Sequence, residues 1–322
     1  MTGDIASVLG ETEKIRVYDL NYLDCSKGQY VSYLKWRGYH VEALYYNALE
    51  KTSTLYDEFF VKKKERWQFD EEGFQESDWP LIGVVQNTRY AESFREVEDE
   101  IIRRLQNCTI VFLSVDTYYL HTRPHVYGKH HEPHSLALIG RKDGDWLVLD
   151  ERSSHLLVYA YTHEAICRAF DSPYGLKQVT CFEPSPTQGP PQVSTEGIIS
   201  RYKTWLAGFE DDLSLYELII QWMEESKDGA LQEGLLRSIS AAFTLLNGSR
   251  DKFAAFTAYM GFDPAIPRML ADCARTADSL RNSVNRAILS GKLPASSIID
   301  KCSLLREQER EMIDTLKERG TR

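Results

Sequence analysis

The spacing of apolar residues changes near position 183 of this chain. Before that point, short apolar runs alternate with polar, turn-forming segments, which is typical of strands and short helices. Beyond it, apolar residues recur every three or four positions over long stretches, which is the period of amphipathic helices. The pattern therefore predicts an α+β domain followed by an all-helical one.

The strands predicted in the first part follow one another closely, so consecutive strands are expected to pair antiparallel. A weaker strand signal precedes them at Leu55 to Val61, and a short apolar run lies at Leu81 to Val85. The five stronger predictions are residues 109–115, 135–139, 146–149, 155–161 and 177–182.

Three helices are expected among these strands. Residues 93–106 carry their apolar side chains on one face, and Thr162 is a suitable N-cap for a short helix that runs to Phe170. The remaining helix begins at or near Cys25 and is expected to stop at Gly38, because glycine commonly terminates helices.

Four prolines within residues 184–195 indicate a linker. The predicted domains are therefore residues 1–183 and residues 196–322, with the linker between them. About five helices are expected in the second domain, over residues 196–223, 231–246, 252–260, 264–289 and 296–319.

Composition narrows the function classes. The chain has 322 residues and a formal net charge of −10, which argues against a nucleic-acid partner because such surfaces are normally basic. It has no apolar run of about 18 residues that would predict a membrane span. The N-terminus lacks the pattern of a secretion signal, and six cysteines occur without CxxC pairs. These features predict a cytoplasmic protein with reduced thiols and no membrane partner.

Residues 116–150 contain five of the eight histidines. The last of them, His134, opens one predicted strand, and Asp150 closes the strand expected to pair with it. Each residue alone has an ordinary interpretation, His134 as a strand-start residue bonded to backbone and Asp150 as a turn residue. At the ends of paired strands they together favour a His–Asp hydrogen bond, the arrangement that orients a catalytic imidazole.

A nucleophile for such a pair is found upstream at Cys25. A helix start lowers the pKa of a thiol there, because backbone N–H groups and the helix dipole favour the thiolate. The neighbours of Cys25 are polar and small, unlike those of a core cysteine. From the local sequence alone, however, a nucleophile and a buried structural cysteine remain about equally plausible.

A metal site is the rival interpretation of the histidines. His121 and His125 are four residues apart and would share a face of a helix, which is a zinc-binding spacing. Pro124 and Pro133, with Gly128, argue against a continuous helix there, and no HExxH motif is present. Motifs for nucleotide binding and a GxSxG nucleophile elbow are also lacking, so the prediction is a site without metal.

The histidine stretch resembles one family, the butirosin biosynthesis protein H family. In that family a D-x-Y-Y-L run, a later tyrosine, an H-x-x-H pair and a strand that closes on aspartate occur in this order. The match covers roughly residues 15–183, and a shorter match places Cys25 where that family carries its cysteine. The residues that carry the resemblance are Asp116, Tyr118, Tyr119, Leu120, Tyr127, His131, His134, Gly140 and Asp150.

The resemblance implies a papain-like or bacteriocin-peptidase-like cysteine fold with a helical C-terminal domain. By carry-over, Cys25 would attack a thioester, His134 would shuttle protons and Asp150 would orient His134. Papain-like enzymes usually have a glutamine shortly before the cysteine for the oxyanion hole, and here the nearest amide is Asn21. The pocket would be shaped by Asp116, Tyr118, Tyr127 and His131.

The implied function is acyl transfer in natural-product biosynthesis, such as that of antibiotics or nonribosomal peptides. An acyl, aminoacyl or peptidyl group would leave the phosphopantetheine of a carrier protein, form an acyl–Cys25 intermediate and pass to an amine. No bound cofactor is expected, because the phosphopantetheine belongs to the carrier. A hydrolase with the same triad, either a peptidase or a thioesterase, and a non-catalytic carrier-binding protein remain alternatives.

Overall fold

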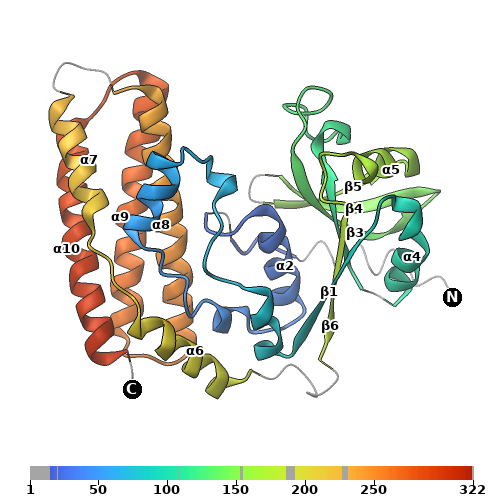
Figure 1. The fold of residues 1–322 in the computed structure, drawn as a ribbon, viewed down its shortest axis with the longest axis horizontal. Helices are drawn as coiled ribbons and strands as arrows, with labels where there is room; N and C mark the ends of the chain where they lie inside the picture. The colour runs from blue at the N-terminus through green and yellow to red at the C-terminus, as the bar shows by residue number, and fades with distance from the viewer. Residues whose placement is uncertain are drawn as a thin grey trace. The chain divides into compact units, whose positions relative to one another are not determined.

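The computed structural model describes residues 15–19, 21–107, 109–152, 155–185, 193–226 and 231–320. The chain separates into two compact units (Figure 1). The first combines residues 1–20, 25–40 and 82–192, and the second combines residues 21–24, 41–81 and 193–322. Residues 1–14 and most of the proline-rich linker lie outside the described residues.

The first unit is built on a six-stranded antiparallel sheet with the order β1-β6-β2-β3-β4-β5. Its α+β class is confirmed. Antiparallel pairing of consecutive strands is confirmed for β2 to β5, but β6 pairs with β1 and β2 and not with β5. A register shift between Leu138 and Gly140 interrupts the β3–β4 ladder. The strands are β1 (Val84–Tyr90), β2 (Val111–Asp116), β3 (Pro133–Lys142), β4 (Asp145–Arg152), β5 (His155–Tyr161) and β6 (Gln178–Pro184).

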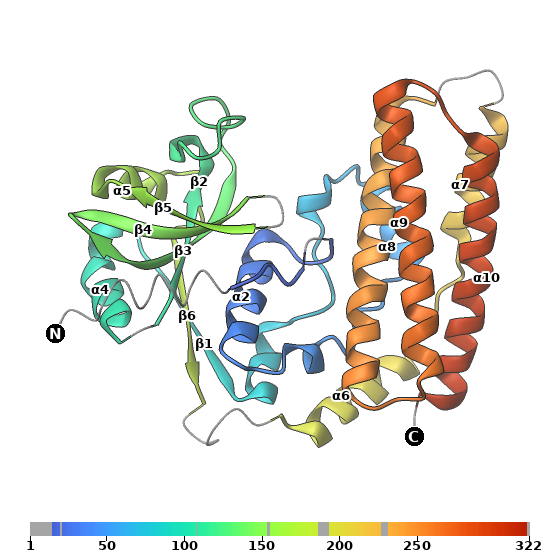
Figure 2. The same ribbon diagram turned by 180° about the vertical axis from the view of Figure 1, so that it is seen from behind.

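Helices cover both faces of this sheet (Figures 1 and 2). On one face lies α2 (Cys25–Trp36), where Tyr30 packs edge-on against Phe112 and Phe182 at ring distances of 4.7 and 5.0 Å. The alternate side chains of β2 face α4 (Glu98–Gln106) and α5 (His163–Asp171) across a buried apolar core. This alternation follows from the two-residue repeat of a strand.

The predicted helix boundaries in this unit are largely confirmed. Helix α2 begins at Cys25 and ends before Gly38, which has a positive φ of 86°. Thr162 caps α5, because its hydroxyl accepts a hydrogen bond from the amide of Ala165 at 3.2 Å. The helix predicted over residues 93–106 is divided into a 3-10 turn, η5 (Phe94–Glu96), and α4. Another 3-10 turn, η6 (Thr117–Tyr119), follows β2.

The strand predicted at Leu55 to Val61 is wrong. This segment belongs to α3 (Thr52–Tyr56) and to a π-helical turn, η2 (Asp57–Val61). Leu55 and Phe59 are four residues apart and both fully buried, which is the spacing of one helix face. The second unit also contains η1 (Val41–Leu44), η3 (Arg66–Gln68) and most of η4 (Glu76–Ile82).

Five long helices complete the described part of the second unit. Helices α8 and α9 pack along their lengths, α9 also packs against α10, and α10 packs against α7 (Figure 2). The helical character of this region is confirmed, but its divisions differ from those predicted. The helices are α6 (Thr195–Ala207), α7 (Ser214–Glu225), α8 (Glu233–Tyr259), α9 (Ala265–Ser290) and α10 (Ala295–Arg319).

Helix α8 spans two segments that the pattern separated at residues 247–251. The polar residues there are tertiary contacts within one helix. Arg250 is 1% exposed and pairs with Glu309 of α10 through Nε–Oε1 and Nη2–Oε2 distances of 2.7 and 3.0 Å. Its Nη1 donates to the carbonyl of Glu50 at 2.7 Å. A buried ion pair needs such additional hydrogen bonds to offset its desolvation.

Residues 41–81 mark the main difference from the predicted division at residue 183. They belong with the helical unit, although they precede every described strand of the sheet in sequence. The amide of Thr52 donates to Asp211 at 2.7 Å, and Ser249 of α8 donates to the carbonyl of Ala48 at 2.6 Å. Contacts so distant in sequence leave no periodic signal in the segment itself. Among the described residues, no helix is long and apolar enough to cross a membrane.

Candidate active site

Cys25 is the first residue of α2, and its side chain is partly exposed. The first turns of this helix are fixed by local bonds. The Ser32 hydroxyl donates to the carbonyl of Gly28 at 2.7 Å and accepts from the amide of Tyr18 at 3.0 Å. At the first residue of a helix, the backbone N–H groups of the first turn and the helix dipole favour a thiolate.

His134 and Asp150 come from the paired strands β3 and β4. The Nε2 of His134 lies 2.8 Å from Oδ1 of Asp150, and both side chains are buried. Burial would lower the pKa of His134, but the hydrogen bond and charge of Asp150, together with a hydrogen bond to the side chain of Cys25, raise it to about 9. Burial would raise the pKa of Asp150, but His134 and Arg123 lower it.

These contacts link the imidazole of His134 to both other predicted catalytic residues. Nε2 is directed at Asp150, and the imidazole is also hydrogen-bonded to the side chain of Cys25. A carboxylate bonded to one nitrogen of an imidazole is the arrangement that orients the ring in sites that use a histidine base. The structure therefore brings Cys25, His134 and Asp150 together in one compact unit.

Gln29 ties the cysteine helix to the histidine strand. It lies one turn after Cys25 in α2, and its Nε2 donates to the carbonyl of Ser135 at 2.8 Å. The Ser135 hydroxyl donates back to Oε1 of Gln29 at 3.2 Å. Since Ser135 directly follows His134 and all four groups are buried, this pair of bonds fixes the start of α2 against the start of β3.

Arg123 is a site residue that the sequence analysis did not identify. It lies in the loop between η6 and β3, and its Nε and Nη2 donate to the two oxygens of Asp150 at 3.2 and 2.9 Å. Its Nη2 also donates to the carbonyl of Glu151 at 3.0 Å and lies 2.6 Å from Nε2 of His134. Nothing in the sequence marks this arginine apart from its place within the histidine stretch.

A second histidine–aspartate pair lies in the same loop region. The Nδ1 of His131 is 2.7 Å from Oδ2 of Asp116, which also accepts from the hydroxyl of Ser172 at 2.6 Å. The other oxygen of Asp116 accepts from the amide of Tyr118 at 3.0 Å. Burial would raise the pKa of Asp116, but these three donors lower it. The His131 ring stacks between Tyr118 and Tyr174, with centroid distances of 4.3 and 4.1 Å.

Tyr127 and Asn21 are two other predicted site residues. Tyr127 is exposed in the loop. Asn21 belongs to the second unit, where its Nδ2 donates to Asn247 at 2.8 Å and its Oδ1 accepts from Arg281 at 3.0 Å. Both ends of its amide are therefore engaged, and its oxyanion role stays a prediction.

The histidine loop does not have the form that a helical metal site requires. Residues 121–129 form turns, as Pro124 predicts, so His121 and His125 are not on a common helix face. Instead His121 packs against the Tyr161 ring, with centroids 4.6 Å apart. Among the residues that the structure describes, no three His, Cys, Asp or Glu side chains gather as a metal-binding group.

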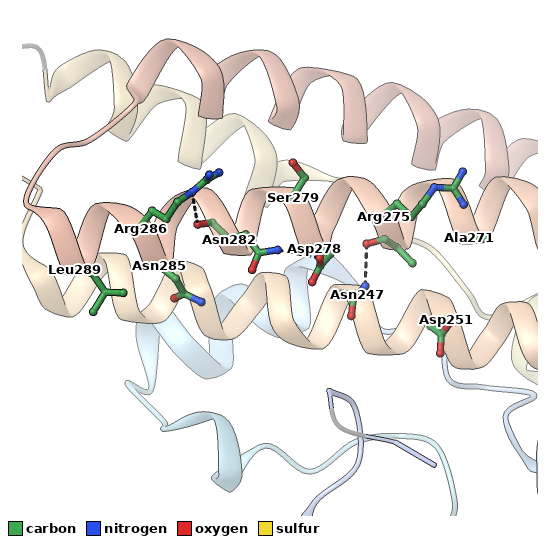
Figure 3. A pocket seen from close by; sticks show the side chains of 11 residues that line it. Asn247, Asp251, Ala271, Arg275, Asp278, Ser279, Asn282, Asn285, Arg286 and Leu289 are labelled. Carbon is green, nitrogen blue, oxygen red and sulfur yellow. Dashed lines mark hydrogen bonds between the residues drawn. The ribbon is translucent and has the colours of Figure 1, made fainter. Parts of the chain in front are cut away.

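The helical unit carries a separate open groove of about 920 Å³ between α8 and α9 (Figure 3). Its polar side chains largely bond with one another or with backbone. Asn247 donates to the carbonyl of Ala274 at 2.9 Å, and Arg286 donates to the carbonyl of Asn282 at 3.2 Å. The groove lining contains neither histidine nor cysteine, so it offers no nucleophile–base pair.

The chain is similar to one curated transferase over nearly its whole length. That protein, from Niallia circulans, is named ribostamycin:4-(gamma-L-glutamylamino)-(S)-2-hydroxybutanoyl-[BtrI acyl-carrier protein] 4-(gamma-L-glutamylamino)-(S)-2-hydroxybutanoate transferase. The two are 26% identical over 305 residues, which are 94% of this chain and 98% of the relative. No family model matches the chain. The similarity confirms the resemblance to the butirosin biosynthesis protein H family.

Proposed function

We propose that this protein is a cysteine-dependent acyltransferase. It takes an acyl group from the phosphopantetheine thioester of a carrier protein and passes it to an amine through an acyl–Cys25 intermediate. One observation carries the mechanism, namely that the imidazole of His134 is hydrogen-bonded both to Asp150 and to the side chain of Cys25. The reaction class is supported by the relative, which transfers an acyl group from a carrier protein to ribostamycin.

The first half-reaction exchanges one thioester for another. Cys25 and His134 form a thiolate–imidazolium pair, because the raised pKa of His134 allows the ring to hold the thiol proton. The thiolate attacks the thioester carbonyl, a bond to Cys25 Sγ forms, and the bond to the pantetheine sulfur breaks. Nδ1 of His134 returns its proton to the leaving thiolate, so His134 becomes neutral and the carrier departs with a free thiol.

The second half-reaction forms an amide. A neutral amine attacks the acyl–Cys25 carbonyl, and His134 accepts a proton from its nitrogen. The C–N bond forms, the C–S bond breaks, and the thiolate–imidazolium pair is restored. Asp150 stabilises the imidazolium in both steps, and Arg123 holds Asp150 by two hydrogen bonds so that this carboxylate keeps its orientation.

The expected partners follow from this chemistry. The donor is an acyl or peptidyl carrier protein, whose phosphopantetheine is part of the substrate, so the enzyme itself needs no bound cofactor. The acceptor is a small-molecule amine in the biosynthesis of an antibiotic-like natural product. Helix-borne Cys25 beside strand-borne His134 supports a papain-like origin for the catalytic unit.

Intact-mass measurement of acyl transfer tests the proposal. The purified chain is mixed with N-acetylcysteamine thioesters of acetate, 4-aminobutyrate and the relative's 4-(gamma-L-glutamylamino)-2-hydroxybutanoate. We expect an adduct on Cys25 that is lost on addition of ribostamycin, with appearance of an amide product. The absence of an adduct with every donor would overturn the proposal.

Two controls sharpen this test. Cys25→Ala should give no adduct, whereas Cys167→Ala should behave like the wild type, because Cys167 lies on α5 beside His163 and outside the site. Formation of free acid at the same rate with and without amines would instead identify a hydrolase. A chain that binds a loaded carrier but never becomes acylated would be a binding protein.

A further inference from the structure

The His131–Asp116 pair is a second acid–base unit that the acyl transfer described above does not use. Asp116 is fully buried at the end of β2 and accepts three hydrogen bonds. One of them comes from Nδ1 of His131, so the other ring nitrogen, Nε2, is the proton-accepting one. Within the described residues Nε2 has no hydrogen-bond partner, and the side chain is 34% exposed.

The surroundings of His131 are aromatic and anionic. The ring is held between Tyr118 and Tyr174 at interplanar angles of 9° and 21°. Aromatic faces attract cations, and the carboxylate of Asp116 holds the Nδ1 edge of the ring by a hydrogen bond. The titratable groups that face this ring are thus Asp116, Tyr118 and Tyr174, and none of them is cationic.

The two histidine–aspartate pairs lie at the same end of the sheet. Asp116 of β2 pairs in register with Pro133, the residue before His134. His131 and His134 are three residues apart, so their Cα atoms are at most about 11 Å from each other. One short segment at this end of the sheet therefore carries both imidazoles.

When the acceptor is a protonated amine, the second half-reaction removes two protons from its nitrogen. An alkyl amine with a pKa of about 10 is an ammonium ion near neutral pH, and it has no lone pair with which to attack. One proton must leave before attack and another afterwards. His134 accepts only one proton at Nδ1, because its Nε2 remains committed to Asp150.

We propose that His131, oriented by Asp116, is the base that removes the first proton from the acceptor's ammonium group. This inference rests on the proposed acyl transfer. The ammonium ion gives one proton to Nε2 of His131, which becomes an imidazolium and releases the proton to solvent through its exposed edge. The neutral amine then attacks acyl–Cys25, and its second proton passes to His134.

The test separates the two half-reactions in a His131→Asn variant, which keeps an N–H donor for Asp116 but has no base. Wild type and variant are first acylated with the thioesters named above, and adduct formation is followed by intact mass. Loss of the adduct is then measured with ethanolamine, which is protonated near neutral pH, and with hydroxylamine, which is not. His130→Asn, an exposed neighbour, is the matched control.

We expect the Cys25 adduct to form at the wild-type rate in His131→Asn. Its transfer to ethanolamine should be about 10²-fold slower than in the wild type, the usual contribution of a general base. Its rate with hydroxylamine should be unchanged, and raising the pH toward the pKa of ethanolamine should restore the ethanolamine rate. Asp116→Asn should likewise slow transfer to ethanolamine and leave transfer to hydroxylamine unchanged.

Equal losses with both amines, or no loss with either, would overturn the role of His131. A loss of acylation would also overturn it, because it would show that His131 only supports the structure of the site. If the wild type itself forms no Cys25 adduct, the acyl-transfer function fails instead, and this is seen before any amine is added.

Discussion

Arg123 and Asp150 form a two-point ion pair directly beside the imidazole of His134. The guanidinium reaches both carboxylate oxygens, at 2.9 and 3.2 Å, while one of those oxygens also bonds to Nε2 of His134. Asp150 is therefore shared between two cationic partners. The ion pair with Arg123 limits how far Asp150 can raise the pKa of His134. It also prevents the carboxylate from rotating.

Replacement of Arg123 by Met should raise the pKa of His134 and lower stability. The pKa rises because a neighbouring positive charge is removed while the charge of Asp150 remains. Stability falls by about 1–3 kcal/mol, because a buried carboxylate loses two donors. NMR titration of the His134 ring and urea unfolding measure the two effects. Arg123→Lys retains the charge without the fork, so it should restore the pKa more fully than the stability.

Stability should depend on pH through His134. Its pKa is about 6.5 in the unfolded chain and is raised to about 9 in the folded one. The raised pKa of His134 adds to the free energy of unfolding. This contribution is complete below about pH 6.5 and is lost as the pH rises to 9. The free energy of unfolding, measured in urea across this range, should fall more steeply for Cys25→Ala than for Cys25→Ala/His134→Gln, because alanine removes the thiol whose proton would otherwise pass to His134. Identical slopes for the two proteins would contradict a charged His134.

Several features of the fold and site could be predicted from sequence, because local signals specify them. The helix start at Cys25, the cap at Thr162 and the strand ends at His134 and Asp150 each have a short-range signature. The edge strand β1 was missed beyond its first residues, since its sequence VVQNTRY is largely polar and half exposed. An edge strand has one unpaired side and can carry such residues.

Long-range contacts explain the other differences. The apolar pattern breaks at residues 247–251 because Arg250 pairs with Glu309 and Gly248 lies against residues 21 and 22. These residues still allow a helical backbone, so α8 continues through residues 247–251. Arg123 was missed for a similar reason, since its role depends on Asp150 across the sheet end. No local pattern encodes either contact.

A methyl group added at Gly248 should disturb the segment that leads into Cys25. A Cβ there would lie 2.6 Å from the amide nitrogen of Tyr22 and 2.7 Å from the carbonyl carbon of Asn21, and backbone cannot yield as a side-chain tip does. Gly248→Ala should therefore destabilise the protein by about 1–3 kcal/mol, the usual cost of overpacking.

Iodoacetamide labelling of Cys25 and urea unfolding would measure the effect of this substitution. Gly234→Ala is the matched control, because it lies in the same helix with nothing within 4 Å of its added Cβ. Alanine there should leave Cys25 reactivity unchanged and stabilise the helix by up to about 1 kcal/mol. Similar behaviour of the two alanine variants would show that the close approach at Gly248 is unimportant.

Gln29 should govern the alignment of Cys25 with His134. In Gln29→Leu, the carbonyl and hydroxyl of Ser135 lose their partner while remaining buried, which costs about 1–3 kcal/mol. The start of β3 is then free to shift from the start of α2, and a misplacement of about 1 Å can reduce the rate of a positioned reaction about 10²-fold. Acylation of Cys25 should fall accordingly. Ser135→Ala removes only the hydroxyl bond and keeps the carbonyl bond. Acylation of Cys25 should therefore fall much less in this variant. If Gln29→Leu lowered stability without slowing acylation, Gln29 would support packing alone and the alignment of the nucleophile and base would have another cause.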